Sequence, residues 1–257
     1  VKKTVLLLGF KKVWTGKKKD KDVSLYDVVV VGGGGTGLMA AYAAAKAGAR
    51  VVVLEKGSAL GGTTAMSVGT VAASATRLQR ENGINDHPDA HFEDMGLFKP
   101  EWANRDHLGF RRLIVDHAPH TIALLEEMGV VFMGPLPEPP HRVPRLHAII
   151  PHSRGFIDHI TRACKAIGVE LKTGQRVLSL RQDQDRVCGV VVETSKGVTE
   201  NILALRGVII ATGDFSAANS AYKRKYMSGP LLEIGGINPL STGDGQVMGE
   251  AVGGEVL

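Results

Sequence analysis

The sequence predicts an α/β protein of the Rossmann-like type, a three-layer ββα fold with a central parallel sheet and a small antiparallel β-meander. Two short apolar runs, residues 27–31 and 50–55, flank an alanine-rich helical segment, which is the pattern of a β-α-β unit. Several further strand-like segments, separated by turns, follow in the second half of the chain. Glycine is abundant, with 32 residues among 257, and aromatic residues make up only 5%, so many close backbone approaches are expected.

The predicted β-α-β unit begins at Tyr26. Residues 27–31 form a continuous apolar run that ends in glycines, as is typical of a strand buried on both faces. Residues 37–47 are rich in alanine and favour a helix, and Gly48 ends it. Residues 50–55 form the second buried strand, and the crossover between the strands should be right-handed.

The remaining elements follow from periodicity and from turn residues. Residues 61–75 are expected to be a loop that enters a helix, and residues 134–144, with five prolines, an extended loop. Residues 106–128 have helical periodicity, and Pro119 should kink or split that helix. A helix over residues 154–167 should be capped and started by Ser153 and Arg154. Strands are expected at residues 169–171, 175–181, 187–194, 199–204 and 207–213, and a helical stretch at residues 246–251.

The net charge of +5 comes largely from lysines in the first 24 residues. We interpret residues 1–24 as a solvated, disordered leader, in preference to a segment that binds nucleic acid or anionic lipid. No apolar run approaches the roughly 20 residues that span a bilayer. Cys164 and Cys188 are isolated and indicate neither a disulfide framework nor a metal site, so a cytoplasmic location is expected.

A glycine-rich turn follows the first predicted strand. Gly32, Gly34 and Gly37 form G-x-G-x-x-G, with Gly35 and Thr36 between them. A lone motif of this kind is weak evidence, but here it follows a buried strand and opens a helix, and Glu55 ends the next strand. Such a turn brings a diphosphate to a helix N-terminus. The acid accepts hydrogen bonds from ribose hydroxyls, and its charge disfavours a 2′-phosphate, so NADP is not expected in this pocket.

NAD and FAD both use this arrangement, and the downstream sequence favours FAD. Residues 61–67 read Gly-Gly-Thr-Thr-Ala-Met-Ser, a run of mostly small side chains that could pass beneath a flat ring system. Residues 211–213 read Ala-Thr-Gly at the end of a predicted strand, which suits a second close approach to a nucleotide. An NAD-dependent dehydrogenase is the weaker alternative.

In their order along the chain, the motifs Asp27 to Gly37, Glu55-Lys56, Gly61 to Ser67, Ala211 to Gly213 and Thr242-Gly243-Asp244-Gly245 resemble the flavoprotein family of fumarate reductase and succinate dehydrogenase. That family includes soluble fumarate reductases, 3-ketosteroid dehydrogenases, L-aspartate oxidase and urocanate reductase. The resemblance covers residues 25–257 and identifies the family, but not the substrate.

The resemblance implies roles for individual residues. The turn from Gly32 to Gly37 would hold the pyrophosphate, and Glu55 the adenosine ribose. Asp244 would lie near the ribityl chain or the pyrophosphate, and Val177 would offer a backbone amide to the adenine. The flavin and ribityl chain would lie against Thr63, Thr64, Met66 and Ser67. The other expected cofactor contacts are Lys56, Gly62, Ala211, Thr212 and Gly213.

Three departures from the family pattern stand out. Thr63 takes the place of the histidine that bonds covalently to flavin in the membrane-bound complexes, so FAD is expected to be held non-covalently. Thr70 replaces the second glycine of a common pair, in Gly69-Thr70. Asp214 replaces the second glycine of Ala-Thr-Gly-Gly and should put a carboxylate near the cofactor.

The family's capping domain, catalytic residues and last flavin-binding segment would all follow Leu257. Residues 25–257 therefore resemble the N-terminal, FAD-binding half of a longer oxidoreductase. Such an enzyme transfers hydride between flavin N5 and a substrate carbon–carbon bond. The alternatives are a 3-ketosteroid dehydrogenase-type fragment and a non-catalytic dinucleotide-binding remnant.

No catalytic residue can be assigned from the sequence. The basic residues around the proline-rich loop have two interpretations: a clamp for a substrate carboxylate, or ordinary basic residues on a surface loop, which we favour. The residues concerned are His141, Arg142, Arg145, His147 and His152. The substrate would be a small molecule, a carboxylate or a ketosteroid, and the electron donor or acceptor is not identified.

Overall fold

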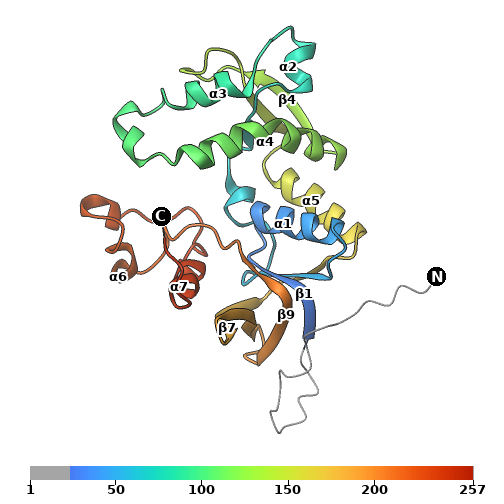
Figure 1. The fold of residues 1–257 in the computed structure, drawn as a ribbon, viewed down its shortest axis with the longest axis vertical. Helices are drawn as coiled ribbons and strands as arrows, with labels where there is room; N and C mark the ends of the chain where they lie inside the picture. The colour runs from blue at the N-terminus through green and yellow to red at the C-terminus, as the bar shows by residue number, and fades with distance from the viewer. Residues whose placement is uncertain (1–23, 257) are drawn as a thin grey trace, which may run out of the picture.

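The computed structural model describes residues 24–256 (Figure 1). The predicted leader lies almost entirely outside the described residues. The strands are β1 (Ser24–Val31), β2 (Val51–Leu54), β3 (Thr70–Ala72), β4 (Val131–Leu136), β5 (Leu146–Ile150), β6 (Glu170–Lys172), β7 (Gln175–Asp183), β8 (Arg186–Thr194) and β9 (Thr199–Ile210). The α-helices are α1 (Gly35–Lys46), α2 (Arg77–Glu81), α3 (Pro88–Met95), α4 (Leu108–Glu127), α5 (Arg154–Ala166), α6 (Ser220–Lys223) and α7 (Asp244–Glu250), and the 3₁₀ turns are η1 (Gly62–Met66), η2 (Pro100–Arg105) and η3 (Gly229–Leu232).

A six-stranded sheet in the order β6-β2-β1-β9-β8-β7 is the frame of the molecule. Its first four strands are parallel, with Val28 opposite Val51 and Gly207, and Val52 opposite Glu170. The last three strands form an antiparallel meander. The predicted parallel sheet and meander are therefore both present, joined through β9.

The strands of the β-α-β unit alternate their side chains between two cores, as the period of a strand requires. On one face, Val30 and Val53 pack with helices α1 and α5, which lie side by side in Figure 1. On the other face, Val29 and Val52 pack with the meander and with Met248 of α7. Helices, parallel sheet and β-meander are thus the three layers that the sequence predicts.

Strand β9 corrects one prediction, because residues 199–210 form a single strand and not two. Its first part pairs antiparallel with β8 and its second part pairs parallel with β1. The register with β1 shifts between Tyr26 and Val28, and Gly207 nearby has φ +157°. An irregularity at this glycine lets the chain continue where the sequence suggests a break.

Residues 70–150 contain elements that are not predicted from the sequence. The unpredicted elements are the three-stranded sheet β3-β5-β4 and helices α2 and α3, which lie with the predicted helix α4 in the upper part of Figure 1. Part of the expected 134–144 loop belongs to strand β4, and the expected loop at residues 61–75 contains η1 and β3. Helix α4 continues through Pro119, so the proline does not split it.

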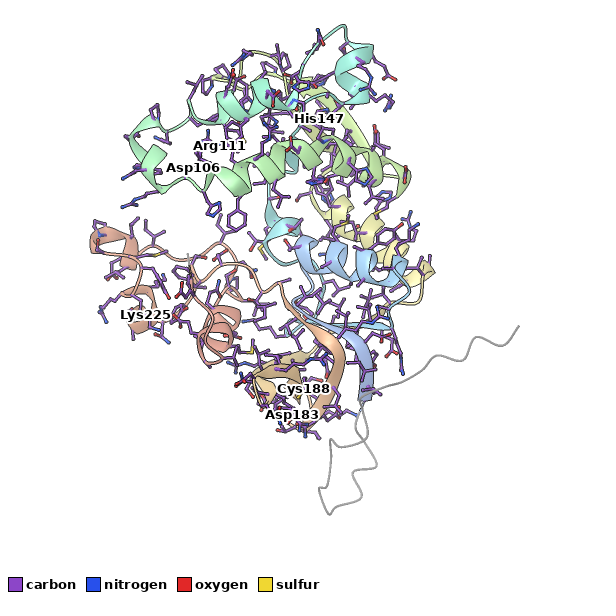
Figure 2. The ribbon with its side chains drawn as sticks, in the orientation of Figure 1. Asp106, Arg111, His147, Asp183, Cys188 and Lys225 are labelled. Carbon is purple, nitrogen blue, oxygen red and sulfur yellow. The ribbon has the colours of Figure 1, made fainter. Side chains whose placement is uncertain are left out.

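Both cysteines of the described residues are free, and Cys164 is buried. Figure 2 shows Cys188 and Asp183 at the meander end of the molecule, and His147 at the opposite end. Within residues 24–256, no helix is long and apolar enough to cross a membrane.

Candidate functional site

A cavity of about 850 Å³ opens where the carboxyl ends of β1, β2 and β9 meet. In parallel α/β sheets, ligands bind at this edge of the strands. Most of the predicted cofactor contacts line this cavity: Gly32, Gly34, Gly35, Thr36, Glu55, Lys56, Gly62, Thr63, Thr64, Met66, Val177, Ala211, Thr212, Gly213 and Asp244. Gly37 and Ser67 do not. Ser67 lines a smaller hollow of about 420 Å³, which shares Gly35, Thr63 and Thr64 with the large cavity.

The three motif glycines have different surroundings, so they are glycine for different geometric reasons. Gly32 has φ +107°, and a Cβ added there would lie 2.4 Å from the carbonyl oxygen of Ala211. A Cβ on Gly37 would lie 2.0 Å from the carbonyl oxygen of Gly32, so this glycine lets α1 pack against the turn. A Cβ on Gly34 would meet only the carbonyl oxygen of Gly61, at 3.8 Å. The fold therefore needs Gly32 and Gly37, whereas Gly34 leaves open space in the cavity.

Helix α1 begins at this open space. Gly34 is its N-cap residue, with φ −78° and no side-chain capping bond. The Gly35 amide donates to Thr64 Oγ1 at 3.2 Å, which ties the helix start to η1. An uncapped helix start offers backbone N–H groups and partial positive charge to an anion.

Glu55 faces the glycine turn and is 8% exposed. Its Oε2 accepts from the Gly33 amide at 2.8 Å, and its Oε1 accepts from the Gly57 amide at 2.7 Å. A carboxylate oxygen can accept more than one hydrogen bond, so both oxygens keep capacity for the hydroxyls of a ribose. The turn and the acid are therefore arranged as the motif predicts.

Lys56 and Asp244 form a bridge across the cavity wall. The Lys56 Nζ donates to Thr242 Oγ1 at 2.6 Å and to Asp244 Oδ2 at 3.1 Å, and the Thr242 hydroxyl donates to Asp244 Oδ1 at 2.8 Å. Burial alone would raise the pKa of Asp244, but the hydrogen bonds from Thr242 and Lys56 outweigh it and lower that pKa. The bridge holds the residue 242–244 segment against the end of β2.

The predicted flavin loop is the 3₁₀ turn η1. The Asn238 Nδ2 donates to Thr63 Oγ1 at 3.2 Å, and its Oδ1 accepts from the Leu240 amide at 3.0 Å. The Ser67 hydroxyl donates to the Thr64 carbonyl at 2.8 Å. Asn238 is 7% exposed and fastens the loop to the C-terminal segment.

The end of β9 forms the third wall. The Ala211 amide donates to the Val31 carbonyl at 2.8 Å, which continues the sheet up to the cavity. A Cβ on Gly245 would lie 2.0 Å from Thr212 Oγ1, so α7 packs directly on this wall. Asp214 lines the cavity, as expected from its place in the sequence, and its Oδ1 accepts from the Ser216 amide at 2.7 Å. It therefore also closes a tight turn.

Neither interpretation of the basic loop at residues 141–152 fits Arg145, whereas Arg142 is exposed, as a surface loop requires. Arg145 is 0% exposed, and its guanidinium donates to both oxygens of Asp86 at 2.7 Å and to Asp94 Oδ2 at 2.6 Å. Arg142 donates to Asp94 and Glu93. His147 is buried, within hydrogen-bond distance of Thr76 Oγ1 and the Arg145 carbonyl. Arg145, Asp86 and Asp94 therefore form a buried ionic cluster, and Arg142 pairs with it from the surface.

Two cavity residues lack any motif signal. Arg154 and Asn238 line the cavity but come from segments far from the glycine turn.

Ser153 was expected to cap α5, yet its side chain makes no capping bond and donates instead to the Ala65 carbonyl at 3.0 Å. Within residues 24–256, no group of three or more His, Cys, Asp or Glu side chains could hold a metal ion.

Comparisons with known proteins support the cofactor. A family model described as FAD binding domain matches residues 27–257. The NADH:fumarate oxidoreductase of Klebsiella pneumoniae (strain 342) is 31% identical over 209 residues, which are 78% of this chain and 22% of that protein.

Two solved structures share the fold. An open conformation of a flavocytochrome c3 fumarate reductase has a TM-score of 0.81 at 26% identity, and the match covers 90% of this chain and 41% of that one. A 3-ketosteroid-Δ4-(5α)-dehydrogenase from Rhodococcus jostii RHA1 in complex with 4-androstene-3,17-dione has a TM-score of 0.77 at 22% identity, with 92% and 56% covered. The chain spans less than half of the length of the two fumarate-reducing relatives.

The cavity fits FAD on its own geometry. It has open space at Gly34, an uncapped helix start, and a buried carboxylate aimed at the turn. Its volume lies in the range of sites that hold cofactors and small ligands. The chain therefore belongs to the family of FAD-binding domains, and its cofactor is FAD.

Proposed function

We propose that this chain is the FAD-binding part of an oxidoreductase that transfers hydride between flavin and a carbon–carbon bond of a small substrate. The observation that carries the proposal is the position of Glu55, which faces the glycine turn inside a cavity at the carboxyl ends of the parallel strands. Relatives that reduce fumarate support the reaction class.

In this proposal, the chain's own residues bind and orient the cofactor. Gly34 and the start of α1 would receive the diphosphate, and Glu55 would accept hydrogen bonds from the adenosine ribose. Thr63, Thr64 and Met66 would lie against the ring system. When bound, FAD supplies the hydride-accepting and hydride-donating chemistry. Asn238 would hold Thr63 in place through its hydrogen bond.

The proposal that FAD is held non-covalently rests on Thr63. A threonine hydroxyl lacks the imidazole nitrogen through which covalent flavin proteins of the resembled family attach their cofactor. Thr63 Oγ1 already accepts from Asn238. The flavin should therefore be released intact when the chain unfolds.

The substrate class that we favour is an unsaturated carboxylate such as fumarate, because a relative at 31% identity acts on fumarate. A ketosteroid is the second candidate, and it rests on a shared fold alone. The Arg142 and Arg145 guanidiniums are bonded to protein carboxylates, so they do not favour either substrate. The cytoplasmic location stays a prediction, and no electron partner is assigned.

The purified chain, supplied with FAD and freed of excess cofactor by gel filtration, tests the proposal. It should show a bound flavin spectrum, and acid denaturation should release FAD into the supernatant. A colourless protein would refute the cofactor site, and flavin that stays with the precipitate would refute non-covalent binding.

Anaerobic mixing then separates the substrate classes. Flavin reduced on the chain should regain its oxidised spectrum with fumarate. Oxidised flavin should bleach with a 3-ketosteroid if the second candidate holds. If neither mixture changes the spectrum, this chain does not perform hydride transfer by itself.

A further inference from the structure

Arg154 is a cation in the wall of the FAD cavity. It is the first residue of helix α5, and it lines the cavity beside Ala65 and Met66. Its Nη1 lies 3.7 Å from the point where a Cβ on Gly61 would be. Gly61 has φ +137° and no side chain, and Ala65 and Ile157 also lie near this position.

Gly61 also adjoins the start of helix α1. Its amide donates to the Gly33 carbonyl at 2.9 Å, and it forms an isolated parallel bridge with Gly34, the N-cap of α1. The Arg154 guanidinium and the start of α1 therefore both lie close to Gly61. Two sources of positive potential, the guanidinium and the helix start, therefore belong to the same cavity.

The charge of the cavity lining makes a cation there favourable for an anionic ligand. Among the described residues that line the cavity, the acidic ones are Glu55, Asp214, Asp244, Glu250 and Glu255, and the basic ones are Lys56 and Arg154. Lys56 is paired with Asp244, and Glu250 is paired with Lys225, which leaves the carboxylates of Glu55, Asp214 and Glu255 against the single cation of Arg154 among these described residues. A diphosphate that enters this excess of carboxylates is stabilised by a positive charge that offsets the repulsion.

Arg154 has the capacity to supply that charge. Its ion-pair contact is with Asp158, at 3.9 Å between Nε and Oδ1, with both side chains about half exposed. That distance is too long for a hydrogen bond, and the pairing of two exposed side chains one helical turn apart is weak. The planar guanidinium suits two phosphate oxygens at once.

We propose that Arg154 binds the diphosphate of FAD and is a cofactor-positioning residue of this chain. The inference rests on the proposed placement of FAD with its diphosphate at the start of α1. From the sequence, Arg154 is expected only to start a helix, because it belongs to none of the cofactor motifs.

FAD titrations of the apo chain test this inference, followed by flavin fluorescence at two salt concentrations. Arg154→Gln should weaken FAD binding about tenfold, which is about 1.4 kcal/mol, in line with a charge-assisted hydrogen bond on a partly exposed group. The loss should shrink as salt rises, because salt screens an exposed charge. The FAD affinity of Arg154→Lys should lie between those of Arg154→Gln and the unaltered chain, since lysine keeps the charge but not the planar guanidinium.

Arg162→Gln is the matched control. Arg162 is an exposed residue of the same helix and does not line the cavity, so its loss removes the same charge away from the site. Its FAD affinity should equal that of the unaltered chain. Thermal melts of the apo variants show whether each one folds. If Arg154→Gln does not fold, the FAD affinity of Arg154→Lys tests the inference.

The outcomes are distinguishable. An unaltered chain that takes up no FAD refutes the cofactor site and this inference together. An unaltered chain that binds FAD, with Arg154→Gln equal to it in affinity and salt dependence, refutes this inference alone and leaves Arg154 free for a substrate carboxylate. An equal loss of FAD affinity in Arg162→Gln would mean that the effect comes from the overall charge of the chain, and this result would also refute the inference.

Discussion

Gly34→Ala separates folding from cofactor binding at the turn. The added methyl meets only the Gly61 carbonyl oxygen, at 3.8 Å, and φ −78° suits any residue. The apo chain should therefore lose at most about 1 kcal/mol of unfolding free energy, the usual scale for a poorer N-cap. The methyl projects into the open space where the diphosphate should approach the helix start.

The magnitude for FAD follows from crowding. Overpacking by one methyl in a well-filled site costs roughly 1–3 kcal/mol, so FAD affinity should fall about 5- to 150-fold. Fluorescence titration measures the affinity, and urea denaturation of the apo chain measures the stability. Gly235→Ala is a matched control, because Gly235 also has open space around it but does not line the cavity.

Two results would refute this reasoning. If Gly34→Ala binds FAD as tightly as the unaltered chain, the diphosphate does not approach this glycine. If Gly34→Ala unfolds the apo chain, then a Cβ at Gly34 does not have the open space that the structure shows there, and the contrast with Gly37 is wrong.

Three further predictions concern stability. Gly37→Ala should lower the free energy of unfolding of the apo chain by about 1–3 kcal/mol or more in urea titrations, because its Cβ would lie 2.0 Å from the Gly32 carbonyl oxygen; a stable variant would contradict the tight packing of α1. Arg145→Met should cost about 3–5 kcal/mol by the same measurement, since it leaves Asp86 and Asp94 buried without their cation; a loss below 1 kcal/mol would count against the ionic cluster. Burial, reinforced by the charges of Arg145 and His141, lowers the pKa of His91 to about 4. As the pH falls from 6.5 to 4, the unfolded chain gains a proton that the folded chain does not, so stability should drop by up to about 3 kcal/mol, and by less in His91→Gln; equal pH profiles for the two proteins would refute it.

Local patterns predicted the elements that are buried on both faces. Residues 27–31 and 50–55 are continuous apolar runs, and the fold buries Val29, Val30 and Val52 completely. Helix α5 was also predicted, and its buried residues Phe156 and Ile160 lie one turn apart. These segments could be predicted because each shows a strong local pattern, either a continuous apolar run or apolar residues at helical spacing.

The elements that were not predicted lack such a local pattern. Strand β3 spans only Thr70–Ala72, too short for an alternating pattern, and β4 contains Gly134 and Pro135, which indicate a loop when read locally. Helix α3 is mostly polar and begins at Pro88. Pairing with β5 and packing against α4 determine these segments, and a local pattern does not report such contacts.

The candidate site divides in the same way. The glycine turn and Glu55 could be predicted because their spacing is a property of one β-α-β unit. Arg154 and Asn238 reach the cavity from other elements, and no spacing connects them to the turn. The environment of Arg145 was not predictable either, because its partners Asp86 and Asp94 lie far away in the sequence.

A crystal structure of the chain with FAD bound is the most direct test of the central claim. We expect the diphosphate at the start of α1 beside Gly34, and the adenosine ribose within hydrogen-bonding distance of the Glu55 carboxylate. FAD bound elsewhere, or with its ribose away from Glu55, would contradict the account.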